Sequence, residues 1–245
     1  LAFLDRHRGE SGIVYCLSRR KTEETAAYLA DNGIHALPYH AGMEKWQRDG
    51  NQDRFMAEDA VVMVATIAFG MGIDKPDVRF VLHTDLPGSI ESYYQEFGRS
   101  GRDGAPAEAM MLYGLGDIRM RRMFIEDEKG SDDRRRQEHK RLDALLAYCE
   151  APQCRRQTLL AYFGEGDESL PSCGHCDLCL DAPAPIDGTH LAHRALDAIR
   201  ETGQRFGAAH VVDVLLGAKN EKGRKLGHDR PDCHGAGKPQ VQVEW

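Results

Sequence analysis

The strongest constraint on how this chain folds is a run of three closely spaced cysteines, Cys173, Cys176 and Cys179. A C-x-x-C turn lets two sulfur atoms reach one metal ion at about 2.3 Å, and tetrahedral zinc requires four ligands. Cys154, which is separated from the run by eighteen residues, is expected to supply the fourth sulfur. Four cysteine ligands leave no open coordination position, so the sequence predicts a structural zinc site rather than a catalytic one.

Other residues compete for a place in this cluster. His175 lies between two of the cysteines, and we expect its ring to point away from the metal. Cys149 is close in sequence but is expected to be an ordinary core thiol, while Cys16 and Cys233 are interpreted as uninvolved. Redox-active thiols are the alternative interpretation. We expect a reducing compartment, in which seven cysteines argue against a disulfide framework.

The first 115 residues alternate short apolar runs with amphipathic segments. Five strands are expected, at 12–17, 35–39, 61–65, 79–83 and 109–113. Ser18 is expected to cap a helix that ends near Asn32, a second helix is expected over 44–56, and Ser89 to cap a third that ends near Gln95. Strands that alternate with helices are joined by crossovers, which predicts an α/β fold with a parallel sheet and helices packed on it.

The pattern changes after residue 114. The sequence predicts helices from 114 to 163, with the charge run at 132–136 as a solvated helix start or loop. Residues 181–188 resemble a linker, and two more helices are expected near 190–201 and 208–217, with a tight turn at 203–207 between them. The last twenty residues give no pattern that predicts an element.

Two glycine-containing segments have the composition of ligand-binding loops. Residues 65–76 read ATIAFGMGIDKP and follow an expected strand, at the sheet edge where open α/β sheets bind ligands. They lack the third glycine of a dinucleotide fingerprint, and a plain tight turn is the alternative. Residues 95–104 contain Arg99 and Arg102 among glycines, an arrangement that brings guanidinium groups close to phosphate oxygens. A salt-bridged loop is the alternative here.

Together these segments resemble the RecQ branch of the superfamily 2 helicases over nearly the whole chain. The resemblance rests on SGIVYC at 11–16 with Ser18 and Arg19, on YHAGM at 39–43, on 65–76, and on SYYQEFGRSGRDG at 92–104. It continues through the cysteine cluster and through 204–207 and 227–229. It implies a second RecA-like helicase lobe at 1–115, a helical four-cysteine zinc module at 116–182 and the first part of a winged helix at 183–245.

The resemblance also implies an activity, namely an ATP-driven enzyme that moves 3′ to 5′ on single-stranded DNA and separates duplexes in repair and recombination. Arg99 and Arg102 would reach the phosphates of ATP, with Arg102 as the arginine finger and Gln95 as a nucleotide sensor. ATP and its Mg²⁺ would be bound together with the first lobe. The residues implied to face DNA are Ser18, Arg19, His40, Gly42 and Thr66. Cys154, Cys173, Cys176 and Cys179 would bind Zn²⁺.

Some features depart from the family. The sequence contains neither a G-x-x-x-x-G-K-[ST] phosphate loop nor a D-E-x-H motif, which we expect in a lobe that precedes Leu1. Phe97 stands where the family has a small or hydroxylated residue, and residues 231–239 do not follow its pattern. We therefore expect the chain alone neither to hydrolyse ATP nor to unwind DNA.

The charge balance allows other interpretations. The net charge is −7, so a DNA contact would have to be a local basic surface. The alternatives are a non-enzymatic, zinc-containing DNA-binding module and a protein-interaction fragment that docks to replication proteins through the winged helix. Single-stranded DNA and its junctions with duplex are the expected partners, a single-stranded-DNA-binding protein is a candidate protein partner, and no membrane contact is expected. The expected location is the bacterial cytoplasm, at the nucleoid.

Overall fold

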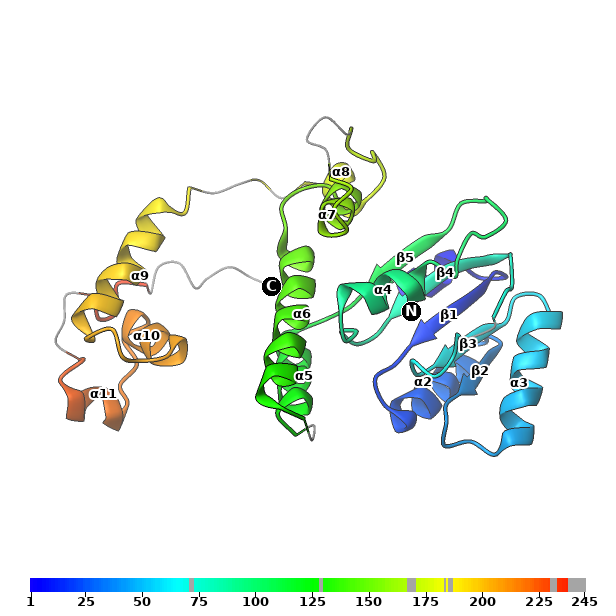
Figure 1. The fold of residues 1–245 in the computed structure, drawn as a ribbon, viewed down its shortest axis with the longest axis horizontal. Coiled ribbons are helices and arrows are strands. Elements are labelled where there is room, and N and C mark those ends of the chain that lie inside the picture. The colour runs from blue at the N-terminus through cyan, green and yellow to red at the C-terminus, as the bar shows by residue number, and fades with distance from the viewer. Residues whose placement is uncertain are drawn as a thin grey trace. The chain divides into compact units, whose positions relative to one another are not determined.

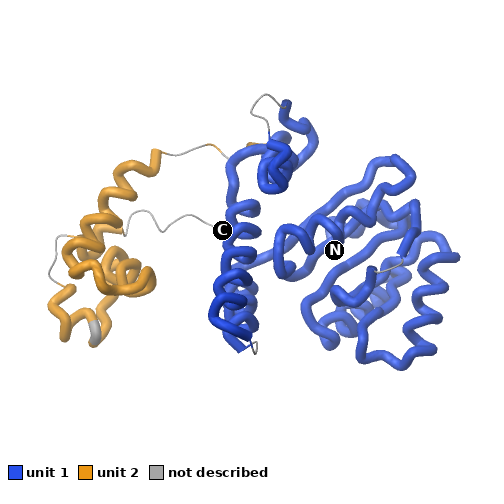
Figure 2. The backbone as a smooth tube through the Cα atoms, in the orientation of Figure 1, with its two compact units in different colours: residues 1–180 blue, residues 181–245 orange. Residues whose placement is uncertain are grey.

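The chain forms two compact units, residues 1–180 and 181–245 (Figure 2). The structure is a computed structural model, and it describes residues 1–70, 73–127, 130–166, 171–182, 184, 187–229 and 233–237. The first unit contains a sheet with flanking helices followed by a helical module (Figure 1). In the described residues of the second unit, the regular elements are helices joined by turns.

The first unit is built on a five-stranded, fully parallel sheet, as the alternating pattern predicts. The spatial order is β2-β3-β1-β4-β5. The strands are β1 (Ser11–Tyr15), β2 (Ala36–Tyr39), β3 (Val62–Ala65), β4 (Val78–His83) and β5 (Glu108–Met111). All five expected strands are present, and each differs from its predicted range by one or two residues at one or both ends. Parallel strands need crossovers, which the intervening helices provide.

Apolar residues cover both faces of this sheet. Helices α1 (Ala2–Arg6) and α2 (Arg19–Asp31) share one core with Val14, Val64 and Leu82. Helix α3 (Lys45–Ala57) contributes Phe55 to the opposite core, around Met63. Burial on both faces explains why the strands read as continuous apolar runs rather than as alternating ones.

The helix starts follow the predicted capping residues. The Ser18 hydroxyl accepts a hydrogen bond from the Lys21 amide at 3.2 Å, at the start of α2. Ser89 does the same for the Ser92 amide at 3.2 Å and begins α4 (Ile90–Phe97). Ser131 caps α6 (Asp132–Glu150), so the charge run at 132–136 is a helix start. Its two leading aspartates lie where the helix dipole favours negative charge.

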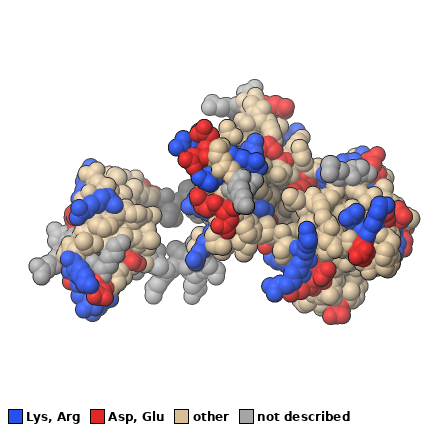
Figure 3. All heavy atoms as spheres, turned by 60° about the horizontal axis from the view of Figure 1, so that its bottom comes forward, with Lys and Arg blue, Asp and Glu red and all other residues tan. Residues whose placement is uncertain are grey.

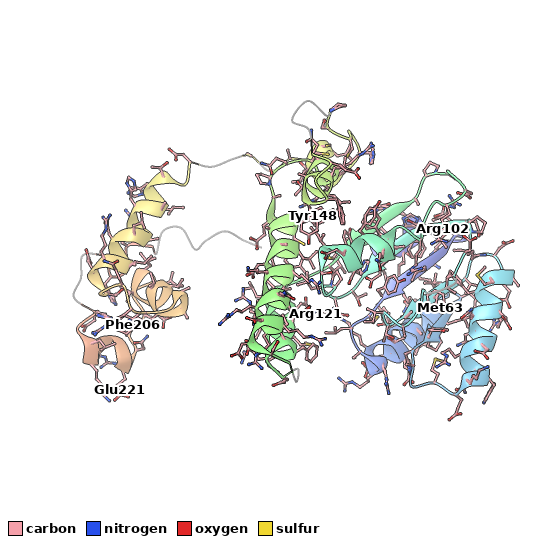
Figure 4. All side chains as sticks on the ribbon, in the orientation of Figure 1. Met63, Arg102, Arg121, Tyr148, Phe206 and Glu221 are labelled. Carbon is pink, nitrogen blue, oxygen red and sulfur yellow. The ribbon has the colours of Figure 1, made fainter. Side chains whose placement is uncertain are left out.

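A helical module completes the first unit. It consists of α5 (Leu115–Asp127), α6, α7 (Arg155–Tyr162) and α8 (Asp177–Leu180). Leu142, Leu145 and Tyr148 on α6 belong to one apolar core. The same core contains Ile90 and Tyr93 in the first turn of α4 and Leu86 before this helix. Figure 4 labels Tyr148 near the end of α6, on the side of that helix toward the sheet. The module and the sheet therefore share a core and form one unit.

The second unit contains α9 (Thr189–Glu201), α10 (Ala208–Leu215) and α11 (Glu221–Leu226). Helices α9 and α10 match the two predicted helices, and the turn between them has positive φ at Gly203 and Gln204. Cys233 is buried in the core of this unit beside Ala198 and Val214. The sequence pattern does not predict α11, nor the short α1 and α8. Parts of the predicted linker and of the segment 231–239 lie outside the described residues.

No helix in the described part of the chain combines the length and hydrophobicity needed to cross a membrane.

The shared core between α4 and α6 generates a stability prediction. Replacing the fully buried Leu145 by alanine is expected to lower the free energy of unfolding by about 2–5 kcal/mol, because it removes buried methyl groups and leaves a cavity. Urea denaturation followed by circular dichroism measures this loss. The matched change Leu180→Ala, at a side chain that is 73% exposed, is expected to shift it by less than about 0.5 kcal/mol. Equal effects of the two changes would contradict the shared core.

Candidate functional site

The four predicted cysteines converge at one place. The sulfur atoms of Cys154, Cys173, Cys176 and Cys179 all lie within 4.8 Å of one another. Cys154 is the residue immediately before α7, Cys179 lies on α8, and the other two lie on the turn that leads into α8. No other group of three or more candidate ligands is found among the described residues.

The spacing of these sulfur atoms fits a tetrahedral metal. Four sulfurs at about 2.3 Å from one zinc ion stand about 3.8 Å apart. The Cys176–Cys179 sulfur pair is separated by 3.4 Å, the Cys173–Cys179 pair by 3.9 Å and the Cys154–Cys176 pair by 4.0 Å. No histidine or carboxylate enters the group, and an all-thiolate set is typical of structural zinc.

Backbone groups around the cluster favour thiolates. Desolvation opposes ionisation of Cys154, but hydrogen bonds from the amides of Cys173 and Gln157 lower its pKa to about 6. The Cys176 amide likewise points at the Cys173 sulfur, at 3.3 Å. Hydrogen bonds from these amides stabilise the negative charge of a thiolate. Thiolate is the form in which cysteine binds zinc.

An arginine ties the two halves of the cluster together. The Arg155 guanidinium, directly after Cys154, donates to both carboxylate oxygens of Asp177, at 3.0 and 2.9 Å. The same group donates to the carbonyl oxygens of Tyr148 and Cys149 at the end of α6, both at 2.8 Å. The hydrogen bond lowers the pKa of the Asp177 carboxyl. Arg155 therefore holds the α6–α7 corner against the start of α8, next to two of the cysteines.

The competing residues lie outside the cluster. His175 is exposed, and neither of its nitrogens belongs to the sulfur group. The Cys149 thiol packs beside the core between α4 and α6, where burial raises its pKa to about 11. It has the character of a core thiol, the role expected from its place in the sequence.

Helix α7 also contacts the helix that leads into the arginine loop. At the end of α7, the Tyr162 hydroxyl donates to a carboxylate oxygen of Glu91 on α4, at 2.7 Å. The Phe163 ring lies 5.1 Å from the Tyr94 ring, also on α4. The helix that begins at a cysteine of the cluster thus ends against α4, which precedes Arg99 by two residues.

The two arginines of the glycine-rich loop both turn toward residues 65–76. Arg99 is half-buried, and one of its terminal nitrogens donates to the carbonyl oxygen of Gly70. Gly70 has a φ of +149°, and a Cβ there would lie 2.4 Å from the Arg99 guanidinium carbon, so this contact requires glycine. Met71 and Gly72 lie outside the described residues.

Arg102 occupies a more open position on the same loop (Figure 4). Its guanidinium donates to Asp74 at 2.8 Å and to the Ile73 carbonyl oxygen at 3.1 Å, and 36% of the side chain stays exposed. The Gly101 amide donates to the carbonyl oxygen of Val78 at 2.9 Å, which fixes the loop at the first residue of β4. Gln95 is exposed on α4, one turn before Arg99.

The candidate DNA-facing residues follow three neighbouring strands. Ser18 and Arg19 come after β1, Thr66 after β3, and His40 and Gly42 after β2. The order β2-β3-β1 places all three strand ends side by side. Because parallel strands end at the same edge of a sheet, these residues share its carboxyl edge.

Direct contacts between these residues hold the carboxyl edge together. A Cβ at Gly42 would lie 2.9 Å from Cδ of Arg19, so the two residues touch. The buried His40 ring accepts from the Gly42 amide at Nδ1, at 3.2 Å, which leaves Nε2 to donate to Glu23 at 3.0 Å. Thr66 donates its amide to the Tyr39 carbonyl oxygen at 3.2 Å.

Several residues that hold this site were not singled out from the sequence. The Asp85 carboxylate accepts from the Leu17 amide at 3.0 Å and from Lys21 at 2.6 Å, and so fixes the turn before Arg19. Glu96 on α4 contacts His83, the last residue of β4, at 2.7 Å, and both are buried. Asp85 has one signal in the sequence, since it follows β4 at the carboxyl edge. Glu96 has none beyond its place beside Arg99.

Family models match three successive parts of the chain. Residues 1–104 match the helicase conserved C-terminal domain. Residues 115–180 match the model described as RecQ zinc-binding, which contains all four clustered cysteines, and residues 182–245 match the RQC domain. The chain belongs to the RecQ family.

Individual RecQ relatives align with almost all of the chain. The ATP-dependent DNA helicase RecQ of Haemophilus influenzae is 43% identical over 243 residues, which are 99% of this chain and 39% of that protein. The Bacillus subtilis protein of the same name is 40% identical over 220 residues, 90% of this chain and 37% of that protein. The ATP-dependent DNA helicase hus2/rqh1 of Schizosaccharomyces pombe is 39% identical, over 95% of this chain and 18% of that protein. The chain thus spans well under half of each of these relatives.

The cluster gives a prediction about metal content. The purified RecQ-family chain is expected to carry one zinc ion, measured by mass spectrometry. A chelator is expected to release the zinc with four titratable thiols and to abolish cooperative melting, because zinc affinity contributes about 10 kcal/mol or more to folding. Cys176→Ser is expected to lose the metal, and the control Cys149→Ala to retain it. A metal-free chain that melts cooperatively would contradict the zinc assignment.

Proposed function

We propose that the complete protein is an ATP-dependent DNA helicase that moves 3′ to 5′ on single-stranded DNA and unwinds duplexes in repair and recombination. This chain would contribute the second motor lobe at 1–115, the zinc module at 116–182 and the first part of the winged helix at 183–245. One observation carries the proposal. The loop 65–76 touches both the arginine loop, through Gly70 and Asp74, and the carboxyl edge, through Thr66.

The arginine loop is proposed to bind the phosphates of ATP with its Mg²⁺. ATP supplies the free energy when bound, and the residues of this chain orient its phosphates. Arg102 suits the role of arginine finger because its guanidinium is partly exposed and held by exchangeable oxygen acceptors. Arg99 is half-buried against Gly70 and would fix the loop while reaching the same phosphates, and the exposed Gln95 would sense the nucleotide.

The carboxyl edge is proposed to bind the DNA strand. Arg19 lies exposed in the first turn of α2, and its guanidinium would pair with backbone phosphate. The hydroxyls of Ser18 and Thr66 and the close backbone approach at Gly42 would contact the same strand, while the buried His40 supports the turn. A movement of the loop 65–76 at the nucleotide would then reach the strand through Thr66.

The remaining parts of the chain would support the proposed helicase activity. Cys154, Cys173, Cys176 and Cys179 would hold Zn²⁺, which supplies folding free energy and takes no part in hydrolysis. The preferred substrates would be single-stranded DNA and its junctions with duplex, with a single-stranded-DNA-binding protein as a candidate partner at the bacterial nucleoid. On the face shown in Figure 3, basic and acidic side chains are interspersed, so the DNA contact would be a local one.

The proposed roles separate in ATPase kinetics of the complete protein. Arg102→Lys is expected to lower DNA-stimulated kcat by about a thousandfold, because lysine lacks the planar fork that stabilises transferred phosphoryl charge. DNA affinity is expected to stay unchanged, and the control Arg122→Lys, on α5, is expected to leave kcat unchanged. The chain alone is expected to show no ATPase. Unchanged kcat in Arg102→Lys, or hydrolysis by the chain alone, would contradict this assignment.

The DNA role of the carboxyl edge is tested by charge reversal. Arg19→Glu is expected to weaken binding of single-stranded DNA at least tenfold. It should also reduce the slope of log affinity against log salt by about 0.7–1, since one phosphate contact is lost. The control Arg8→Glu lies at the opposite end of α2, where Arg8 contacts Asn32, and is expected to keep the full slope. Identical slopes for both variants would favour a protein-interaction role.

A further inference from the structure

Trp46 is the most exposed aromatic side chain among the described residues. It lies in the first turn of α3 with 72% of its surface accessible, and it belongs to none of the buried clusters. Ile67, directly after Thr66, is 76% exposed. Single exposed apolar side chains are common on protein surfaces, so the significance of these two depends on where they lie.

The path of α3 places Trp46 at the carboxyl edge of the sheet. Asn51 donates to the Pro38 carbonyl oxygen in β2 at 2.8 Å, and Arg54 contacts His35, just before β2, at 2.7 Å. Helix α3 therefore runs antiparallel to β2. With about 1.5 Å of rise per residue, Trp46 stands about 7.5 Å beyond Asn51, past the end of the strand.

This position adjoins the proposed DNA contacts. Strands β2 and β3 are paired, and the Thr66 amide donates to the Tyr39 carbonyl oxygen, so Ile67 and the segment before Trp46 leave neighbouring strand ends. Arg19 touches Gly42 in that same segment, four residues before Trp46. One edge thus presents a guanidinium group together with an exposed indole and an exposed aliphatic side chain.

We propose that Trp46 is a base-stacking residue for single-stranded DNA, with Ile67 as its apolar neighbour. This inference rests on the proposed DNA role of the carboxyl edge and adds to it a contact with bases. Proteins that hold single strands combine a cationic track for phosphates with aromatic faces on which bases stack, and stacking tolerates any sequence. Arg19 would supply the first component and Trp46 the second.

The proposal is tested with the fluorescence of the zinc-loaded chain. The sequence contains two tryptophans, Trp46 and Trp245, so Trp245→Phe leaves Trp46 as the single indole reporter. Titration with a single-stranded oligothymidylate is expected to quench Trp46 emission, with a midpoint equal to that from anisotropy of the labelled oligonucleotide. Stacking brings the indole into contact with a base, whereas a phosphate contact by Arg19 alone would leave the emission unchanged.

Variants in the Trp245→Phe background distinguish stacking from other roles. Trp46→Ala is expected to weaken oligonucleotide binding about tenfold, and Trp46→Phe to restore most of it, because phenylalanine keeps an aromatic face. The matched control is Tyr28→Ala, which removes an aromatic side chain that is 54% exposed in the last turn of α2, at the opposite edge. It is expected to bind normally.

Three outcomes overturn the proposal. Saturable binding with unchanged Trp46 emission and normal affinity of Trp46→Ala would remove the stacking role while leaving the DNA edge in place. Emission that changes with protein concentration in the absence of DNA, together with normal DNA binding by Trp46→Ala, would assign the indole to an interface between copies of the chain. Absence of any binding in the anisotropy experiment would overturn both this inference and the proposed DNA edge.

Discussion

The apolar contact between α4 and α6 connects the two parts of the first unit. Leu86, Ile90 and Tyr93 enter it from the sheet side, and Leu142, Leu145 and Tyr148 enter it from the helical module. Hydrogen bonding adds a second connection, from Tyr162 at the end of α7 to Glu91 on α4. Because α4 runs directly into the arginine loop, the cysteine cluster and the arginines are attached to the same helix. Loss of the cluster would therefore act on the loop through packing, without any direct contact.

The parallel direction of the strands brings the residues of the carboxyl edge together. Segments that are far apart in sequence, after β1, β2 and β3, come together only because these strands run side by side in one direction. The loop between β3 and β4 then extends from Thr66 at this edge to Asp74 beside Arg102. A single loop thus contacts both candidate ligand sites, so a change at one of the proposed sites could reach the other through this loop.

Local sequence signals predicted the elements and the cysteine cluster well. The C-x-x-C spacing fixes which sulfurs can meet, and the hydroxyl caps at Ser18 and Ser89 fix where helices begin. Contacts between distant residues could not be predicted in this way. The Asp85–Leu17 hydrogen bond joins residues 68 positions apart, and the Tyr162–Glu91 bond spans 71. Each depends on strand order and helix packing, which no short segment encodes.

The arginine contacts are compatible with the phosphate role proposed for this loop in an acidic chain. In this structure Arg102 is bound by a carboxylate and a carbonyl oxygen, and Arg99 by a carbonyl oxygen, so each guanidinium is already oriented by acceptors. Asp74 is 83% exposed, so its ion pair with Arg102 is screened by water and costs little to exchange. A phosphate oxygen offers the same kind of acceptor with more charge. Under the proposed role, the loop would be ordered before nucleotide binds and Arg102 would exchange its acceptors for phosphate oxygens, whereas Arg99, half-buried against Gly70, would mainly fix the loop.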